Sequence, residues 1–167
     1  LIILSSENLK FSLYCTWFLE AYLLGTEQIN QDCLALLKKL INSILSAWCN
    51  KKDKTSVCSF VAERSFVTEL VLISRRLKSV VSKSSQIIQL HSELLSLDRS
   101  ISQVVFVPIS SLSDHVVVRI PYKDASVLNS KDKTPYLVYV EVIEQTKSTN
   151  FFSNVNTFRQ EEFKKFM

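Results

Sequence analysis

The chain has 167 residues, of which 47% are hydrophobic and 22% are charged. This balance is typical of a folded globular protein and excludes wholesale disorder. The net charge of +4 does not indicate nucleic acid as a partner, because the basic residues are interspersed with acidic ones. Gly25 is the single glycine, which excludes an ordinary glycine-rich phosphate loop and favours long helices.

Four helices are predicted in the first hundred residues, at about 6–24, 29–49, 60–81 and 84–98. The first is apolar along two stripes, and such a helix is usually buried between neighbours. Its stripes are Phe11, Cys15, Phe18 and Tyr22, and Leu13, Trp17 and Leu24. The other three carry one stripe each, with apolar residues three or four positions apart. These stripes are Leu37, Leu40, Ile44 and Trp48; Phe66, Leu70, Ile73, Leu77 and Val80; and Ile87, Leu90, Leu94 and Leu97.

The connections between these helices are short. Residues 50–56 are polar and predict a loop, and Ser82–Ser85 predicts the turn before the fourth helix. Ser84 or Ser85 is the expected N-terminal cap of that helix. Because the connection is so short, the third and fourth helices are expected to be antiparallel neighbours.

The pattern changes near residue 103. Short runs rich in β-branched residues follow at 104–107, 115–120 and 136–143, and they predict strands of a small antiparallel sheet. The fold class is therefore predicted to be α+β. We expect a helical part over residues 1–100, a sheet part over 101–144 and a variable tail over 145–167, in which 158–167 is a candidate short helix.

The remaining chemistry-bearing residues predict structural roles. The four cysteines have no metal-site spacing, and Cys15 and Cys33 are expected to be buried free thiols, which fits a reduced, cytoplasmic compartment. His91 is expected on a helix surface, and His115 is expected to open a strand as a structural residue. The four helical carboxylates Glu63, Glu69, Glu93 and Asp98 are expected to be solvated. No transmembrane segment is expected, since Lys10 and Glu20 interrupt the apolar stretch over 9–24.

One polar loop stands out between two strand-like runs. Its sequence is Val127-Leu128-Asn129-Ser130-Lys131-Asp132-Lys133-Thr134-Pro135-Tyr136. A hydroxyl, two cations and the backbone N–H groups of a tight turn are suited to binding an anion. The alternative is a hairpin tip whose charges are simply solvated.

This loop and its flanks resemble the start of the kinase N-lobe in type III-beta phosphatidylinositol 4-kinases. The resemblance covers Asp114-His115-Val116-Val117-Val118-Arg119-Ile120-Pro121 and the run from Val127 to Val142, with Thr134 where the family commonly has Ala. Upstream, Phe66–Leu77 and Ser92–Leu97 resemble the helices just before that lobe. Lys10–Tyr22 is similar to the last part of the family's helical domain, so the resemblance extends over about 7–144.

The resemblance implies an enzyme that transfers the γ-phosphoryl group of ATP to the 4-hydroxyl of phosphatidylinositol with Mg²⁺. In that family the matching loop covers the ATP phosphates. The implied ATP-binding residues are Leu128, Asn129, Ser130, Lys131, Asp132, Lys133 and Pro135. Leu128 and Pro135 would line the roof of the nucleotide pocket, and Ser130 would lie over the phosphates.

The family's catalytic groups are not in this sequence. Phosphoryl transfer needs a lysine on the phosphates and an Asp and an Asn that hold Mg²⁺. The family's strand lysine, Asp-Arg-His-Asn loop and Asp-Phe-Gly motif lie further along the chain than the matched part, and Lys131 and Lys133 do not replace that lysine. No catalytic residue and no metal ligand are therefore expected here. The chain begins with Leu and is expected to be a fragment, inactive alone.

Two other interpretations remain open. The family's helical domain presents surfaces to Rab-type small GTPases, so the helices at 6–24 and 29–49 are an alternative interaction module that is not itself an enzyme. The resemblance places the parent protein in the cytoplasm, peripheral on Golgi or related membranes. The third interpretation is a degraded or alternatively spliced product without a stable fold, which would melt non-cooperatively.

Overall fold

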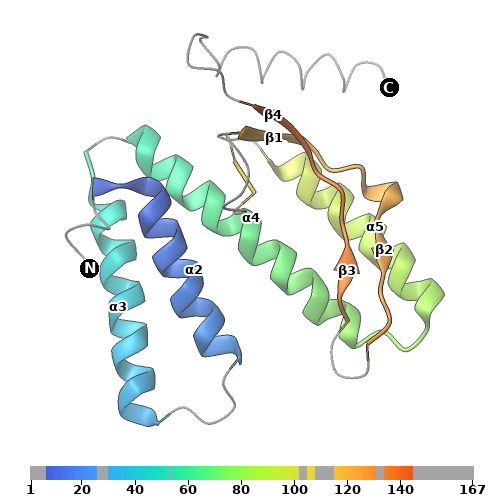
Figure 1. Cartoon of the computed structure of the whole chain (residues 1–167), viewed down its shortest axis with the longest axis horizontal. Helices are drawn as coiled ribbons and strands as arrows, with labels where there is room; N and C mark the ends of the chain where they lie inside the picture. The colour runs from blue at the N-terminus through green and yellow to red at the C-terminus, as the bar shows by residue number, and fades with distance from the viewer. Residues whose placement is uncertain are drawn as a thin grey trace. The chain divides into compact units, whose positions relative to one another are not determined.

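The computed structural model describes residues 7–25, 30–52, 54–101, 105–107, 115–130 and 134–144. In these ranges, four helices precede two small antiparallel sheets, which confirms the α+β class (Figure 1). The chain divides into two compact units, Leu1–Arg64 and Ser65–Met167, and the division falls inside helix α4. The domain boundary expected near residue 103, where helices give way to strands, stays a prediction.

The N-terminal unit contains α2 (Leu9–Gly25), α3 (Gln31–Cys49) and the first part of α4 (Lys54–Lys78). The side-chain oxygens of Asn8 and Asn30 accept backbone N–H groups of the first turns of α2 and α3, at 3.0 and 3.1 Å. These caps explain why the two helices begin where they do. Within the described ranges, no helix has the length and apolar character that a bilayer-spanning segment needs.

Trp48 of α3 is the centre of the core of this unit. Its ring stacks on Phe60 with centroids 5.1 Å apart and an interplanar angle of 5°. Its Nε1 donates a hydrogen bond of 2.7 Å to the hydroxyl of Ser12, which is fully buried on α2. Leu13 and Ile44 are also fully buried. One indole therefore contacts residues of all three helices, as its core spacing predicts.

The expectation that α2 is buried on both apolar stripes is wrong. Phe11, Tyr14, Phe18 and Tyr22 are 38%, 39%, 72% and 50% exposed, and they lie three or four positions apart. α2 instead turns Leu13 and Leu19 inward, together with the small polar residues Ser12 and Thr16. The period of a helix gives the position of a stripe, but its burial depends on whether another element covers it.

Two other expectations in this unit are also wrong. Cys33 is exposed rather than buried, and Cys15 is half-buried. Burial raises the pKa of the Cys15 thiol, so the reactive thiolate is disfavoured there. Glu63, expected to be solvated, is only 2% exposed.

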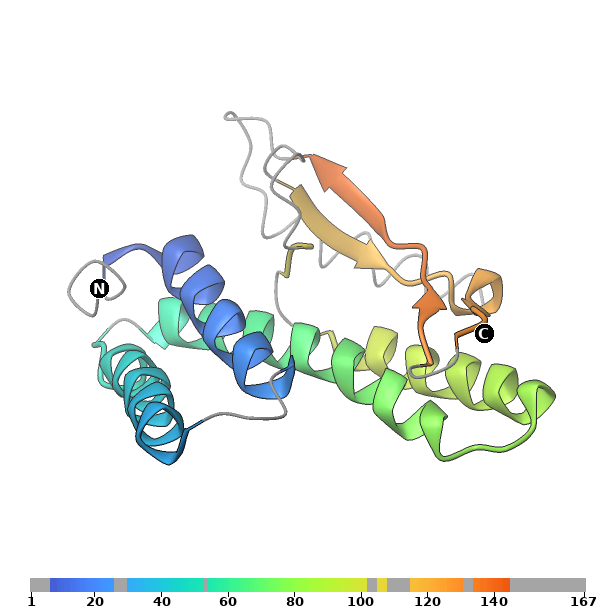
Figure 2. The ribbon, with the colours of Figure 1, turned by 60° about the horizontal axis from the view of Figure 1, so that its bottom comes forward.

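The C-terminal unit is built on a helix pair, the part of α4 from Ser65 onward and α5 (Lys83–Ser100). The two run side by side, joined by a short turn (Figure 2). Their facing residues are buried, as the stripes predict: Phe66, Ile73, Leu77, Leu90, Leu94 and Leu97. The predicted turn and cap are displaced, because the cap of α5 is Ser82 and not Ser84 or Ser85.

Four strands and one short helix follow this pair. β1 (His115–Arg119) pairs antiparallel with β4 (Glu141–Glu144), and β2 (Ser126–Val127) pairs antiparallel with β3 (Tyr136–Leu137). The helix η1 (Tyr122–Asp124) and β2 lie against α5.

The predicted strand pattern needs three corrections. Residues 136–143 do not form one strand, since 138–140 are irregular between β3 and β4. Residues 105–107 form no strand, although Val117 N donates to Val105 O at 2.7 Å. The sequence pattern missed β2, because two residues give too short a run to detect. The candidate helix at 158–167 lies outside the described residues.

The pairing of β1 with β4 contains a bulge. Val117 pairs with Val142 and Arg119 pairs with Glu141, so two steps on β1 match one on β4. Nη2 and Nε of Arg119 each donate to one oxygen of the Glu141 carboxylate, at 2.6 and 3.1 Å. Such paired contacts are directional and fix the register beside the bulge.

His115 opens β1 as a structural residue, which confirms its predicted role. Only 7% exposed, it accepts a hydrogen bond of 2.9 Å through Nε2 from the backbone N–H of Val107. Since Nε2 accepts, the proton of the neutral ring lies on Nδ1.

We expect Leu94→Ala to destabilise the C-terminal unit by about 2–5 kcal/mol, because it removes a fully buried side chain from the helix seam. Urea unfolding of the chain, followed by circular dichroism, measures this change. Ile88→Ala on the same helix is the matched control, since Ile88 is 71% exposed and its truncation should cost no more than about 0.5 kcal/mol. Equal losses of stability in the two variants would contradict the packing of Leu94 between α4 and α5.

Candidate functional site

The candidate site is the loop between β2 and β3. Val127 pairs with Tyr136, and beyond this pair the N–H of Leu128 donates to the carbonyl of Pro135 at 2.9 Å. This bond continues the ladder by one step, so the chain between Leu128 and Pro135 is the tip of a closed hairpin. The two ends of this loop, Leu128 and Pro135, are therefore held together at the end of the sheet.

The described loop residues present both apolar and polar groups. Leu128 is 47% exposed, Asn129 and Ser130 are exposed, and Pro135 is half-buried. Lys131, Asp132 and Lys133 lie outside the described residues. The ATP-binding role of all seven residues stays a prediction.

Three side-chain contacts tie the hairpin to the helix pair. Ser74 Oγ of α4 donates to the carbonyl of Thr134 at 2.8 Å, and Tyr136 Oη donates to the carbonyl of Leu70 at 2.7 Å. From α5, Nζ of Lys83 donates to Oδ1 of Asn129 at 2.6 Å. The first two contacts are partly buried and the third is exposed.

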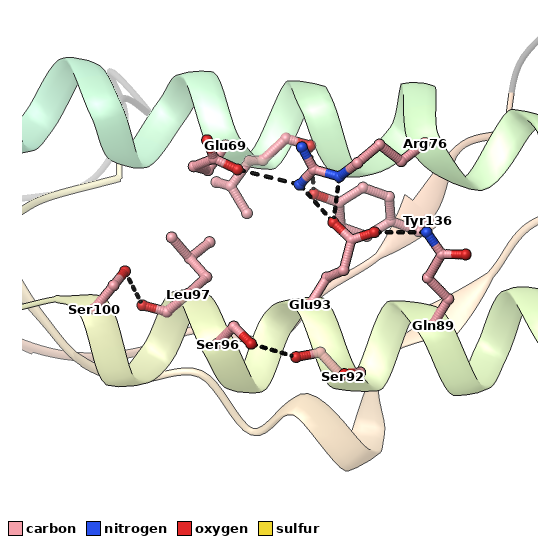
Figure 3. A network of polar contacts seen from close by, with 10 residues as sticks. Glu69, Arg76, Gln89, Ser92, Glu93, Ser96, Leu97, Ser100 and Tyr136 are labelled. Atoms are coloured by element: carbon pink, nitrogen blue, oxygen red, sulfur yellow. Dashed lines mark hydrogen bonds and ion pairs between the residues drawn. The ribbon is translucent and has the colours of Figure 1, made fainter.

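Tyr136 lies in the polar network shown in Figure 3. Arg76 of α4 binds Glu69 on its own helix at 3.1 Å and Glu93 of α5 at 2.5 Å, and Gln89 donates to the other oxygen of Glu93 at 2.8 Å. The hydrogen bond with Glu93 is the main reason that the pKa of Arg76 is raised. Glu69 and Glu93 are thus not simply solvated, because both bind the same guanidinium.

The environment of Tyr136 favours its neutral form. Burial raises the pKa of Tyr136 well above its ordinary value, the nearby Glu93 carboxylate raises it further, and the Arg76 guanidinium lowers it. The phenol therefore keeps the proton with which it binds the Leu70 carbonyl.

Two contacts of α5 hold the chain that leads into the hairpin. Oδ1 of Asp98 accepts the N–H of Ile120 at 2.7 Å, and Nε2 of His91 lies 3.0 Å from the carbonyl of Ala125. Asp98 was expected to be solvated and His91 to be on the surface, but both are partly buried and bind backbone groups. The His91 ring also contacts the edge of Tyr122, with centroids 6.4 Å apart.

The sequence pattern did not identify the residues that position the loop. Ser74 and Lys83 look like ordinary helix-surface residues, because their acceptors are 60 and 46 positions away along the chain. Tyr136 gave one signal, an aromatic residue with a polar end at the start of a strand, which usually finds a hydrogen-bond partner when buried.

The chain is similar to curated lipid kinases over part of its length. It is 45% identical over 82 residues to the phosphatidylinositol 4-kinase beta of Sorex araneus, and equally to the proteins of that name from Bos taurus and Rattus norvegicus. The match covers 49% of this chain but only 10% of the length of each relative. No protein-family model matches. The matches to the three kinases confirm the resemblance to phosphatidylinositol 4-kinases of the beta type.

We expect the free energy of unfolding to fall as the pH rises above about 10, the ordinary pKa of tyrosine, because the unfolded chain then loses a proton that folded Tyr136 retains. The contribution of Tyr136 amounts to about 1.4 kcal/mol per pH unit until the pH reaches its raised pKa. Tyr136→Phe should remove this part of the pH slope in urea unfolding between pH 8 and 11.

Tyr139→Phe is the matched control, since Tyr139 is 52% exposed. This variant should keep the pH slope of the unmodified chain. The account of Tyr136 would be wrong if Tyr136→Phe and the unmodified chain lost stability equally with rising pH.

Proposed function

We propose that the chain is a segment of an ATP-dependent lipid kinase that phosphorylates phosphatidylinositol at the inositol 4-hydroxyl. In this proposal the hairpin tip 128–135 covers the phosphates of ATP, and the parent protein acts at Golgi or related membranes. The observation that carries the proposal is the closed hairpin at the sequence that resembles the family's phosphate-covering loop. The relatives named phosphatidylinositol 4-kinase beta support the same reaction.

The described residues fit this task. Leu128 is an exposed apolar residue, and Ser130, two positions along the chain, is an exposed residue with a hydroxyl. Nucleotides need this combination, an apolar surface near the base and sugar and hydrogen-bond donors at the phosphates. ATP would supply the phosphoryl group to be transferred, and the chain's own residues would bind and orient it and exclude water.

The covering loop alone does not supply the charge neutralisation that phosphoryl transfer requires. We therefore expect no phosphorylation of phosphatidylinositol by the purified 167-residue chain with ATP and Mg²⁺. Incorporation of ³²P into lipid vesicles measures this, with a phosphatidylinositol 4-kinase beta as the positive control. Turnover by the chain would show that the catalytic groups have been wrongly assigned.

A segment exchange tests the proposed function itself. Residues 65–144 would replace the matching segment of the Rattus norvegicus phosphatidylinositol 4-kinase beta. We expect the hybrid to keep ATP-dependent phosphorylation of phosphatidylinositol within about tenfold of the rat protein, because covering and positioning tolerate moderate sequence change. A hybrid that folds cooperatively but is inactive would refute the proposal.

One observation favours a second function, binding of a Rab-type small GTPase by the N-terminal unit. The aromatic stripe of α2 (Phe11, Tyr14, Phe18 and Tyr22) is exposed, and exposed aromatic residues are enriched in protein interfaces. The core packing that would otherwise explain these residues is therefore not found in the described part of the chain.

We expect the chain to retain GTP-loaded Rab proteins more than GDP-loaded ones in a pull-down. Phe18→Ser should weaken this retention at least tenfold if Phe18 is an anchor of the interface. Leu36→Ser is the matched control, since Leu36 is 57% exposed and belongs to α3 rather than to the stripe of α2. Equal retention of the two nucleotide states would exclude this function.

A further inference from the structure

We propose that the α4–α5 helix pair positions the hairpin tip for the nucleotide through three residues, Ser74, Lys83 and Tyr136. This inference rests on the proposed function, because it explains how the covering loop is held. We call the three contacts the clamps. Their partners are Thr134, Asn129 and the carbonyl of Leu70, respectively.

The clamps hold the two arms of the tip from different helices. Ser74 and Leu70 are on α4, and they bind the arm that returns from the tip, at Thr134 and Tyr136. Lys83 begins α5, and it binds Asn129 on the arm that enters the tip. The distance between the arms is therefore coupled to the packing of one helix against the other.

Contacts from the helices matter for the tip because its sequence has no glycine with which to form a tight turn. The chain has one glycine, and it is not in this loop. Within the described ranges, which leave out 131–133, no residue has a positive φ angle. A loop without a glycine turn is kept in one geometry by contacts from outside, and phosphate positioning requires a single geometry.

An ion pair between the two helices lies next to the Tyr136 clamp. Tyr136 lies next to the ion pair of Arg76 with Glu93, which joins α4 to α5 (Figure 3). Its hydroxyl is kept neutral there, so it remains a donor to Leu70 at any ordinary pH. Tyr136 and Ser74 both make partly buried bonds, so we expect removal of either to have a similar effect.

The first experiment uses the chain as it is and requires no nucleotide. The N–H of Leu128 closes the tip, so its hydrogen exchange, followed by NMR, reports how often the tip opens. We expect the Leu128 N–H to exchange about fivefold faster in Tyr136→Phe and in Ser74→Ala, because each variant loses one hydrogen bond. In Lys83→Met we expect exchange about twofold faster, because the contact of Lys83 is exposed.

Each variant has a matched control in the same unit. Tyr139→Phe removes an exposed phenol, Ser96→Ala removes a hydroxyl that bonds only within α5, and Lys78→Met removes a lysine from the last turn of α4. None should change the exchange of Leu128. Ser74→Thr keeps the hydroxyl and should restore slow exchange. Unchanged exchange in all three clamp variants would overturn the inference.

The second experiment places the same variants in the active rat hybrid. We expect Tyr136→Phe and Ser74→Ala to raise KM for ATP about three- to tenfold, with KM for phosphatidylinositol unchanged and Ser74→Thr close to the unmodified hybrid. An equal rise in both KM values, or none, would show that the clamps support the hairpin without positioning it for the nucleotide. That result would overturn the inference and leave the proposed function intact, whereas an inactive unmodified hybrid would refute the function.

Discussion

The apolar seam between α4 and α5 is the constraint on which the C-terminal unit depends. Leu77, Leu90 and Leu94 are fully buried in it. The sheets are too small to be stable alone, since two-stranded pairs are marginal in water. The β2–β3 sheet has a surface to lie on, because β2 and the neighbouring η1 contact α5.

Polar contacts then determine how the strands sit on that surface. Asp98 and His91 bind the backbone before the hairpin, and Ser74 and Tyr136 bind the hairpin itself. Each contact contributes only about 0.5–1.5 kcal/mol, so none of them determines whether the unit folds. Together they determine the position of a loop that has no glycine turn of its own. Burial supplies the stability of this unit, and hydrogen bonds supply its geometry.

The sequence predicted the features that arise from a repeating period. The seam of α4 and α5 was predicted at Phe66, Ile73 and Leu94 because helical spacing puts such residues on one face. The exposure of Phe18 was not predicted, because the burial of a helix face depends on whether another element covers it. The clamps of Ser74 and Lys83 join residues far apart in the chain, which no local pattern reveals. The similarity to a kinase family located the loop, but it did not locate the residues that hold it.

The two histidines of the unit use the same ring nitrogen in opposite ways. Nε2 of His91 must donate, because the Ala125 carbonyl has no proton to give, whereas Nε2 of His115 accepts from Val107. The two neutral rings therefore carry their proton on different nitrogens, Nε2 in His91 and Nδ1 in His115. One imidazole supplies a hydrogen to a backbone carbonyl, and the other supplies a lone pair to a backbone N–H, so the same residue type completes opposite kinds of unsatisfied main-chain group on either side of β1.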